Sequence, residues 1–184
     1  MERTSNLLGG ALLGAALFAT ALLAPLPSHG ASKDPVMDRL QRLEDREQIL
    51  ELLTAYGATL DRHDFVAFGQ LFAEDAIYGS GPNATRGRAA IQSMLENQLL
   101  SNPMKLPPPN HHLFTNPSIR IEGDRATAHS LGAYVAPDLE RKVTNLVFFV
   151  TYDDVLVRKD GRWLFQQRVL NAAAAPAPAP AAPR

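Results

Sequence analysis

Residues 118–128 read SIRIEGDRATA, and they contain a turn flanked by strand-like sequence. Ile119 and Ile121 alternate with polar side chains, which is the period of a strand with one covered face. Gly123 and Asp124 then supply the small residues that a two-residue hairpin turn requires. This stretch therefore predicts an antiparallel hairpin.

The same kind of pattern continues to the end of the folded region. Residues 125–135 form the returning strand, and residues 143–157 form a long strand whose centre is apolar on both faces. We expect that strand to be central, with both faces covered. Asp160 and Gly161 predict a second hairpin turn, and residues 162–170 close the sheet. In this last strand, Trp163, Phe165 and Val169 are apolar residues at alternating positions.

Upstream of the hairpin the apolar period is helical. Asp34 can cap a long helix over residues 36–60, a short helix follows Asp64, and a third helix is predicted near residues 88–99. A short strand is expected around residues 76–78. Helices followed by strands indicate the α+β class, a cone of three N-terminal helices packed on a curved, mainly antiparallel sheet, with a pocket at its open end. The long helix carries two apolar stripes, Val36, Leu40, Leu43, Leu50 and Gly57, and beside them Ile49, Leu53, Tyr56 and Leu60.

The two termini differ from the middle in composition. Residues 1–30 have a basic residue, an apolar run and small residues in the order typical of a signal peptide, with the cut after Gly30. The alternative is an uncleaved membrane anchor. Residues 171–184 are almost all Ala and Pro and predict a disordered tail. The folded domain is then 31–170, and we expect it to be periplasmic or secreted, without membrane contact after cleavage.

The overall composition excludes several function classes. The formal charge is −1, which argues against a nucleic-acid-binding protein because such proteins normally carry a basic surface. The sequence has no cysteine, so disulfides, thiolate nucleophiles and cysteine-based zinc sites are excluded. The sequence also contains no phosphate-binding loop, no nucleophile elbow and no pair of histidines at metalloprotease spacing.

A few polar residues remain as candidates for chemistry. Asp61 lies where the long helix ends, and Tyr56 precedes it by five positions. By pattern alone, an aspartate such as Asp61 is more often a turn or capping residue, and a tyrosine such as Tyr56 is more often a core residue. His111 and His112 begin a strand, so their side chains point to opposite faces and cannot bind one metal ion. One of them can face the pocket, either as a general base or as a hydrogen-bonded core histidine.

The motifs taken together resemble the SnoaL-like domains of the nuclear transport factor 2-like superfamily. The resemblance covers about residues 38–170, and it implies the cone-shaped α+β fold described above. Within the superfamily, the motifs are most similar to those of scytalone dehydratase, bile-acid dehydratase and hexachlorocyclohexane dehydrochlorinase. The stretches that carry the resemblance are RLEDREQI (42–49), LDRHD (60–64), LFAEDA (71–76), HHLFTN (111–116), IEGDRATA (121–128) and DGRWLF (160–165).

The resemblance also implies a function. His112 would remove a proton, Asp61 would orient His112 and stabilise its imidazolium, and Tyr56 would hydrogen-bond a substrate oxygen, with no metal or cofactor. The expected activity is that of a dehydratase-like lyase or isomerase acting on a small hydrophobic ring compound. The alternative is a non-catalytic protein of the same fold that binds a small molecule or serves as a structural subunit. The apolar strand 143–157 and the family's common sheet-mediated dimers further predict a homodimer or small homo-oligomer.

Overall fold

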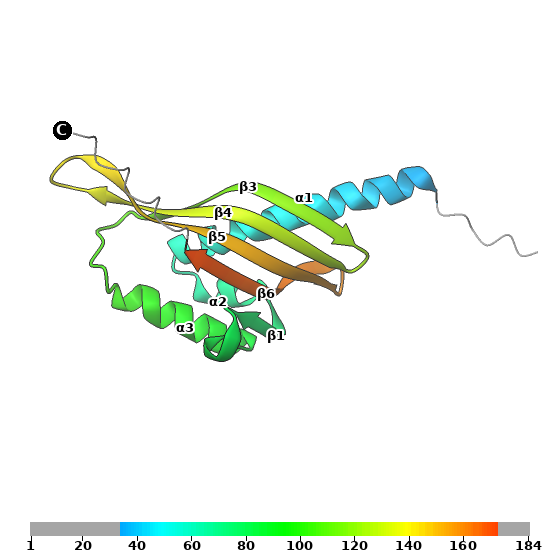
Figure 1. The fold of residues 1–184 in the computed structure, drawn as a ribbon, viewed down its shortest axis with the longest axis horizontal. Coiled ribbons are helices and arrows are strands. Elements are labelled where there is room, and N and C mark those ends of the chain that lie inside the picture. Colours follow the sequence, from blue (N-terminus) through cyan, green and yellow to red (C-terminus); the bar gives the residue numbers. More distant parts are fainter. Residues whose placement is uncertain (1–33, 173–184) are drawn as a thin grey trace, which may run out of the picture. The chain divides into compact units, whose positions relative to one another are not determined.

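The computed structural model describes residues 34–172, so the predicted signal peptide and most of the predicted tail lie outside the described residues. The chain here forms three α-helices, a 3-10 helix and one six-stranded sheet (Figure 1). The predicted α+β class, with helices packed on a curved, mainly antiparallel sheet, is confirmed. No helix among these residues is long and apolar enough to cross a membrane. The elements are α1 (Pro35–Asp61), α2 (Phe65–Gly69), β1 (Phe72–Tyr78), η1 (Gly81–Asn83), β2 (Thr85–Arg86), α3 (Arg88–Ser101), β3 (His111–Glu122), β4 (Arg125–Asp138), β5 (Val143–Lys159) and β6 (Arg162–Ala172).

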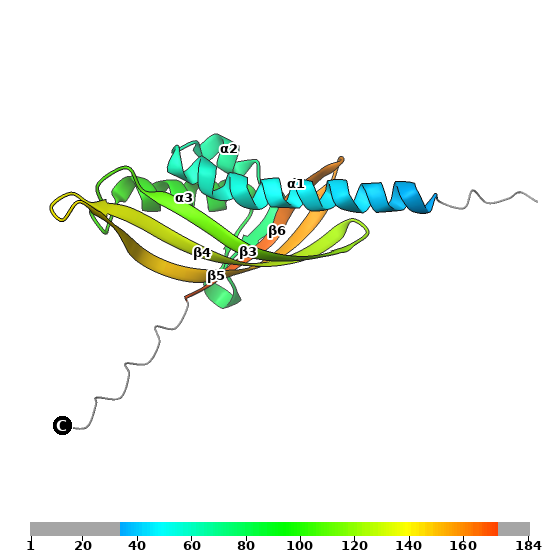
Figure 2. The ribbon, with the colours of Figure 1, turned by 90° about the horizontal axis from the view of Figure 1, so that it is seen from above.

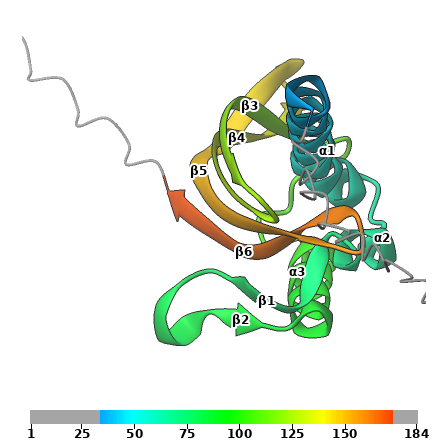
Figure 3. The same cartoon turned by 90° about the vertical axis from the view of Figure 1, so that its right-hand side faces the viewer.

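The sheet has the strand order β2-β1-β6-β5-β4-β3. Strands β3 to β6 form the predicted antiparallel meander, and both predicted hairpin turns are present, with positive φ angles at Gly123 and at Asp160 and Gly161. The strands bend around the helices, as seen end-on in Figure 3. One face of the sheet therefore covers the core, and the other face is the outer face.

Helix α1 is the longest helix, and only its second half packs on the sheet. Asp34 caps it as predicted, accepting a hydrogen bond of 2.9 Å from the backbone N–H of Val36. The stripe containing Ile49 and Tyr56 is buried. The other stripe is exposed at its beginning, where Leu40 and Leu43 face solvent, because the first turns of α1 extend past the strands (Figure 2).

Gly57 brings the end of α1 unusually close to β3. A Cβ atom at this position would lie 2.8 Å from Cε2 of Phe114 and 2.9 Å from Cβ of His112. Both separations are shorter than ordinary van der Waals contacts, so no larger residue fits without movement of β3. The missing side chain therefore places the C-terminal turn of α1 directly against the start of β3.

Strands β1 and β2 differ from the sequence-based expectation. β1 begins at Phe72, four residues before the predicted start, and pairs in parallel with β6. Its register shifts between Phe72 and Ile77, so burial does not alternate along it. Because of this irregularity, period-two analysis identifies only the last part of the strand. The two-residue strand β2 pairs with β1 and was not predicted.

Strand β5 is central, as predicted, but the expectation that both faces are covered is wrong near its beginning. Leu146 is 61% exposed and Phe149 is 40% exposed. The hairpin of β4 and β5 extends beyond the neighbouring elements (Figure 1), so no described residue covers its outer face. Strand β6 includes Asn171 and Ala172, which the sequence-based prediction places in the tail. Asn171 donates a hydrogen bond of 2.8 Å to Asp153, so the ordered domain extends past residue 170.

Candidate active site

A cavity of about 570 Å³ lies between the helices and the inner face of the sheet. Its walls come from the C-terminal end of α1, from α3 and from strands β3, β4 and β5, with single residues from β1 and β6. The connection between α3 and β3 forms its rim. All three site residues predicted from the sequence, Tyr56, Asp61 and His112, line this one cavity.

Asp61 and His112 are in direct contact. Asp61 is the last residue of α1 and His112 is the second residue of β3, which the close approach at Gly57 brings together. Nδ1 of His112 lies 2.6 Å from Oδ1 of Asp61, and the backbone N–H of His112 donates to both carboxylate oxygens at 3.1 Å. Because an ionised carboxylate can only accept, Nδ1 carries a proton and Nε2 is left free to accept one. Both side chains are largely buried.

His111 also reaches Asp61. Its side chain is 56% exposed, but it lines the same cavity as His112, and its Nδ1 lies 3.5 Å from Oδ2 of Asp61. The expectation that only one of the two histidines faces the pocket is therefore not met. One carboxylate thus lies beside two imidazoles. No group of three or more His, Asp, Glu or Cys side chains that could hold a metal ion occurs within residues 34–172.

Two phenol hydroxyls lie deeper in the cavity. Tyr56 and Tyr78 share a hydrogen bond of 2.7 Å between their oxygens. Burial raises the pKa of Tyr56 and of Tyr78 above the ordinary phenol value, so both remain protonated at neutral pH. One of the two hydroxyls donates its proton to the other, and the hydroxyl that accepts keeps its own proton to donate to a ligand oxygen. Tyr78 was not identified from the sequence, because the register shift in β1 leaves no alternating pattern that shows which face the side chain occupies.

His112 also contacts an aromatic residue from the neighbouring strand. The ring centroid of Tyr134 lies 4.5 Å from that of His112, and Tyr134 stacks in turn on Phe148 at 5.1 Å. Burial, and then the charge of Asp61, raise the pKa of Tyr134. These rings restrict the orientations that the imidazole can adopt.

A buried arginine lies behind the tyrosines. The guanidinium carbon of Arg168 is 4.0 Å from the ring centroid of Tyr56 and 4.1 Å from that of Tyr152, distances typical of cation–π contacts. Nε of Arg168 is 3.3 Å from Oδ1 of Asp154 on β5. Among the described residues, neither the Arg168 guanidinium nor the Asp154 carboxylate forms a hydrogen bond. Burial raises the pKa of Asp154 to about 6, and the Arg168 charge counteracts part of that rise.

Arg168 was missed because of one extra residue in β6. Phe165 pairs with Leu156 and Gln167 pairs with Val155, so Gln166 is a bulge. Strict alternation predicts that Val169 faces the same side as Phe165. After the bulge the side chains change faces, so Val169 lies on the outer face and Arg168 points into the core.

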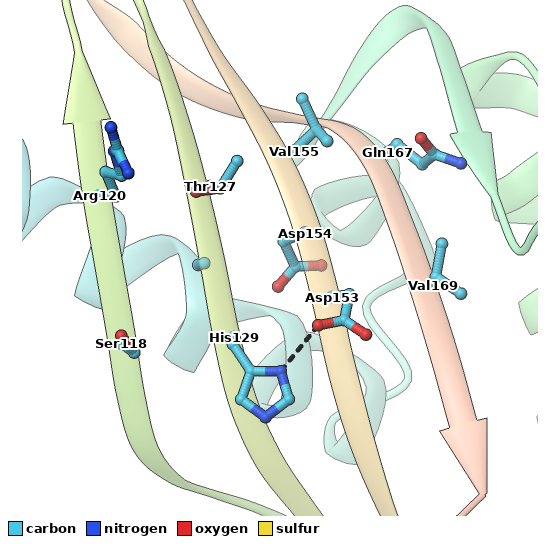
Figure 4. A pocket seen from close by; sticks show the side chains of 10 residues that line it. Ser118, Arg120, Thr127, His129, Asp153, Asp154, Val155, Gln167 and Val169 are labelled. Carbon is cyan, nitrogen blue, oxygen red and sulfur yellow. Dashed lines mark hydrogen bonds and ion pairs between the residues drawn. The ribbon is translucent and has the colours of Figure 1, made fainter.

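A second histidine–aspartate pair lies in a hollow on the outer face of the sheet (Figure 4). Nδ1 of His129 is 2.7 Å from Oδ1 of Asp153, a contact similar in length to that between His112 and Asp61. Both side chains of this outer pair are more than half exposed, and the hollow is open to solvent. The two pairs therefore have similar contact lengths but different environments.

The comparisons with known proteins agree with this fold. Residues 41–169 match the family model of the SnoaL-like domain. Among solved structures, an NTF2-like protein with a cystatin-like fold from Novosphingobium aromaticivorans is 25% identical, with a TM-score of 0.66 over 79% of this chain and 94% of the other. ActVI-ORFA from Streptomyces coelicolor is 23% identical, with a TM-score of 0.63 over 72% and 98%. A protein from N. aromaticivorans provisionally identified as a scytalone dehydratase is 22% identical, with a TM-score of 0.59 over 72% and 86%. None of the curated proteins matches the chain in sequence.

Proposed function

Because this chain belongs to the SnoaL-like domain family, we propose that it is a cofactor-independent lyase or isomerase of the dehydratase type, acting on a small hydrophobic ring compound. The observation that carries the proposal is the contact between Asp61 and His112 inside a cavity that also presents the hydroxyls of Tyr56 and Tyr78. A base held by a carboxylate, close to neutral hydrogen-bond donors, suits proton removal next to a carbonyl group.

The proposed reaction needs only groups of this chain. Nε2 of His112 removes a proton from a carbon next to the substrate carbonyl, and the electron pair moves onto the carbonyl oxygen. Tyr56 or Tyr78 donates a hydrogen bond to that oxygen. The electrons then return to expel a hydroxyl group, which takes the proton from the imidazolium and leaves as water. Asp61 stabilises the imidazolium between these two steps. For an isomerase, the same proton returns to another carbon.

The size of the cavity limits the substrate to a small molecule. Cavities of 300 to 1,000 Å³ enclose most of a drug-sized ligand, and this one holds about 570 Å³. Leucine, proline and aromatic side chains make up much of its wall, so the body of the ligand is expected to be apolar.

The proposal can be tested without knowledge of the natural substrate. Cyclic ketones such as cyclohexanone and 2-tetralone are incubated with the protein in D2O, and deuterium uptake next to the carbonyl is followed by NMR. We expect uptake faster than in the presence of the His112→Ala variant. Ketones that bind without any exchange would favour the alternative of a non-catalytic binding protein or structural subunit.

A homodimer is part of the same proposal. The outer face of the sheet exposes Leu113, Leu146 and Phe149, with 48%, 61% and 40% of each residue accessible. An apolar sheet face of this kind is more stable when it is covered by a second copy. We expect light scattering of the wild-type protein at micromolar concentration to give twice the chain mass, and the Phe149→Asp variant to give the monomer mass. Val66→Asp, at an exposed apolar position on α2, is the control and should remain dimeric. A wild-type monomer would contradict the proposal.

Export rests on the sequence of residues 1–30 alone. We expect the mature protein to begin at Ala31 and to be found in the periplasm or the medium. Intact-mass measurement of the protein purified from these fractions checks the position of the cut. Full-length protein recovered only with membranes would support the anchor instead.

A further inference from the structure

The side chain of Asn102 holds together the first part of the connection between α3 and β3. Asn102, the residue after α3, accepts a hydrogen bond of 3.0 Å from the backbone N–H of Leu106 and donates one of 3.0 Å to the carbonyl of the same residue. Its own carbonyl accepts from the backbone N–H of Lys105 at 2.9 Å. Residues 102–106 therefore form a closed loop in which the Asn102 amide pairs with the Leu106 peptide group (Figure 1 shows the connection between α3 and β3).

This loop is the rim of the candidate active site. Asn102, Pro103, Met104 and Leu106 all line the cavity that contains Asp61 and His112. Met104 is 51% exposed, and Leu100, which precedes the loop on α3 and lines the same cavity, is 60% exposed. When a ligand covers apolar side chains at a cavity mouth, the burial of their accessible surface contributes favourably to the binding free energy. The polar groups of the proposed reaction, on Asp61, His112, Tyr56 and Tyr78, line the same cavity.

We infer that Asn102 is a specificity-determining residue, which holds Met104 and Leu106 at the mouth so that they bind the apolar body of an amphipathic ligand. This inference rests on the proposed function only in taking the same cavity as the ligand site. The ligand class that fits is a neutral molecule with one hydrogen-bonding end and an extended hydrocarbon part. Selection for the hydrocarbon part depends on the two hydrogen bonds that hold the loop closed.

Asn102 has a second role that the test must separate from the first. It ends α3 with φ of 39° and ψ of 60°, a left-handed conformation that asparagine and glycine tolerate best. Asn102→Gly keeps this helix-ending conformation but removes both side-chain hydrogen bonds. Asn102→Asp keeps an acceptor for the Leu106 N–H and loses the donor to its carbonyl. Met104→Ser leaves the Asn102 bonds intact and removes an apolar side chain from the rim.

The experiment measures the binding of phenol, 4-methylphenol, 4-ethylphenol and 4-propylphenol by calorimetry, together with thermal melting of each protein. In the wild type, we expect affinity to rise up to about fourfold with each added methylene, the value for full burial. In Asn102→Gly the increment should fall below about twofold. Met104→Ser should also flatten the series, and Asn102→Asp should lie between Asn102→Gly and the wild type.

Either of two results would overturn the inference. One is a wild-type protein whose affinity does not rise along the series. The other is a folded Asn102→Gly protein with the wild-type increments, which would leave Asn102 as a helix-ending residue only. If Asn102→Gly does not fold, wild-type increments in Met104→Ser would be equally decisive. Alkylphenols are ligands and not substrates here, so an absence of catalysis would refute the proposed function and leave this result unaffected.

Discussion

Replacing His112 by alanine is expected to reduce turnover by at least about a hundredfold, the lower end of what a general base contributes. Asp61 fixes the imidazole through the contact of 2.6 Å at Nδ1, which leaves Nε2 to accept the proton. Alanine has no group that can accept it. The measurement is the rate of deuterium uptake by a cyclic ketone or, once identified, of conversion of the substrate. Melting of the variant within a few degrees of the wild type shows that the loss is chemical.

Asp61→Asn should give a loss of similar size, because the amide keeps the shape but not the charge that stabilises the imidazolium. Since the two residues act as one unit, the double variant should lose much less than the product of the single losses. His129→Ala is the matched control: it removes a histidine with a similar carboxylate contact, on the solvent side of the sheet, and should retain full activity. An active His112→Ala protein would refute the mechanism, and losses that multiply would show that the residues act independently.

The stability of the domain is expected to depend on pH through Asp154. Burial raises the pKa of this carboxyl from 3.8 to about 6 in the folded protein, so folding favours its protonated form. This contribution to stability is fully present below about pH 4 and is lost as the pH rises through 6. A pKa difference of about two units corresponds to about 3 kcal/mol in total, of which about 2 kcal/mol is lost between pH 4.5 and 7.5.

Urea denaturation at these two pH values, on the wild type and on Asp154→Asn, measures the effect. The variant lacks the titrating group. Between the two pH values, the free energy of unfolding of the wild type should therefore fall by about 2 kcal/mol more than that of the variant. Subtracting the two profiles removes the contribution of all other carboxylates. Identical pH dependence in the two proteins would mean that Asp154 has the same proton affinity folded and unfolded.

The sequence predicts the helices and the meander well, because their apolar periods are regular. It fails where a local irregularity interrupts the period. The bulge at Gln166 reverses the faces of the residues after it, so a strictly alternating pattern places Val169 inside and leaves Arg168 unnoticed. The register shift in β1 has the same effect on Tyr78. Neither irregularity has a glycine or proline to mark it.

The candidate site residues were found in a different way. Periodicity alone favours a capping role for Asp61, and it is consistent with His112 as either a base or a core histidine. Family resemblance, and not the physics of the local sequence, paired them across 51 positions. The pairing depends on the close approach at Gly57, a contact distant in sequence that no local pattern encodes. The expectation of a covered β5 was wrong for a similar reason, since burial depends on the length of neighbouring elements.

The double attachment of Asp61 has a consequence for how this protein can diverge. Its carboxylate accepts hydrogen bonds from both the ring and the backbone N–H of His112. It therefore links α1 to β3 and also orients the imidazole. Loss of the imidazole would abolish proton transfer by this residue but keep the hydrogen bonds between the Asp61 carboxylate and the backbone of β3. Loss of the carboxylate would remove these hydrogen bonds as well as the support of the imidazole. A descendant that keeps the cavity for binding alone is therefore expected to lose the histidine first and to retain the aspartate.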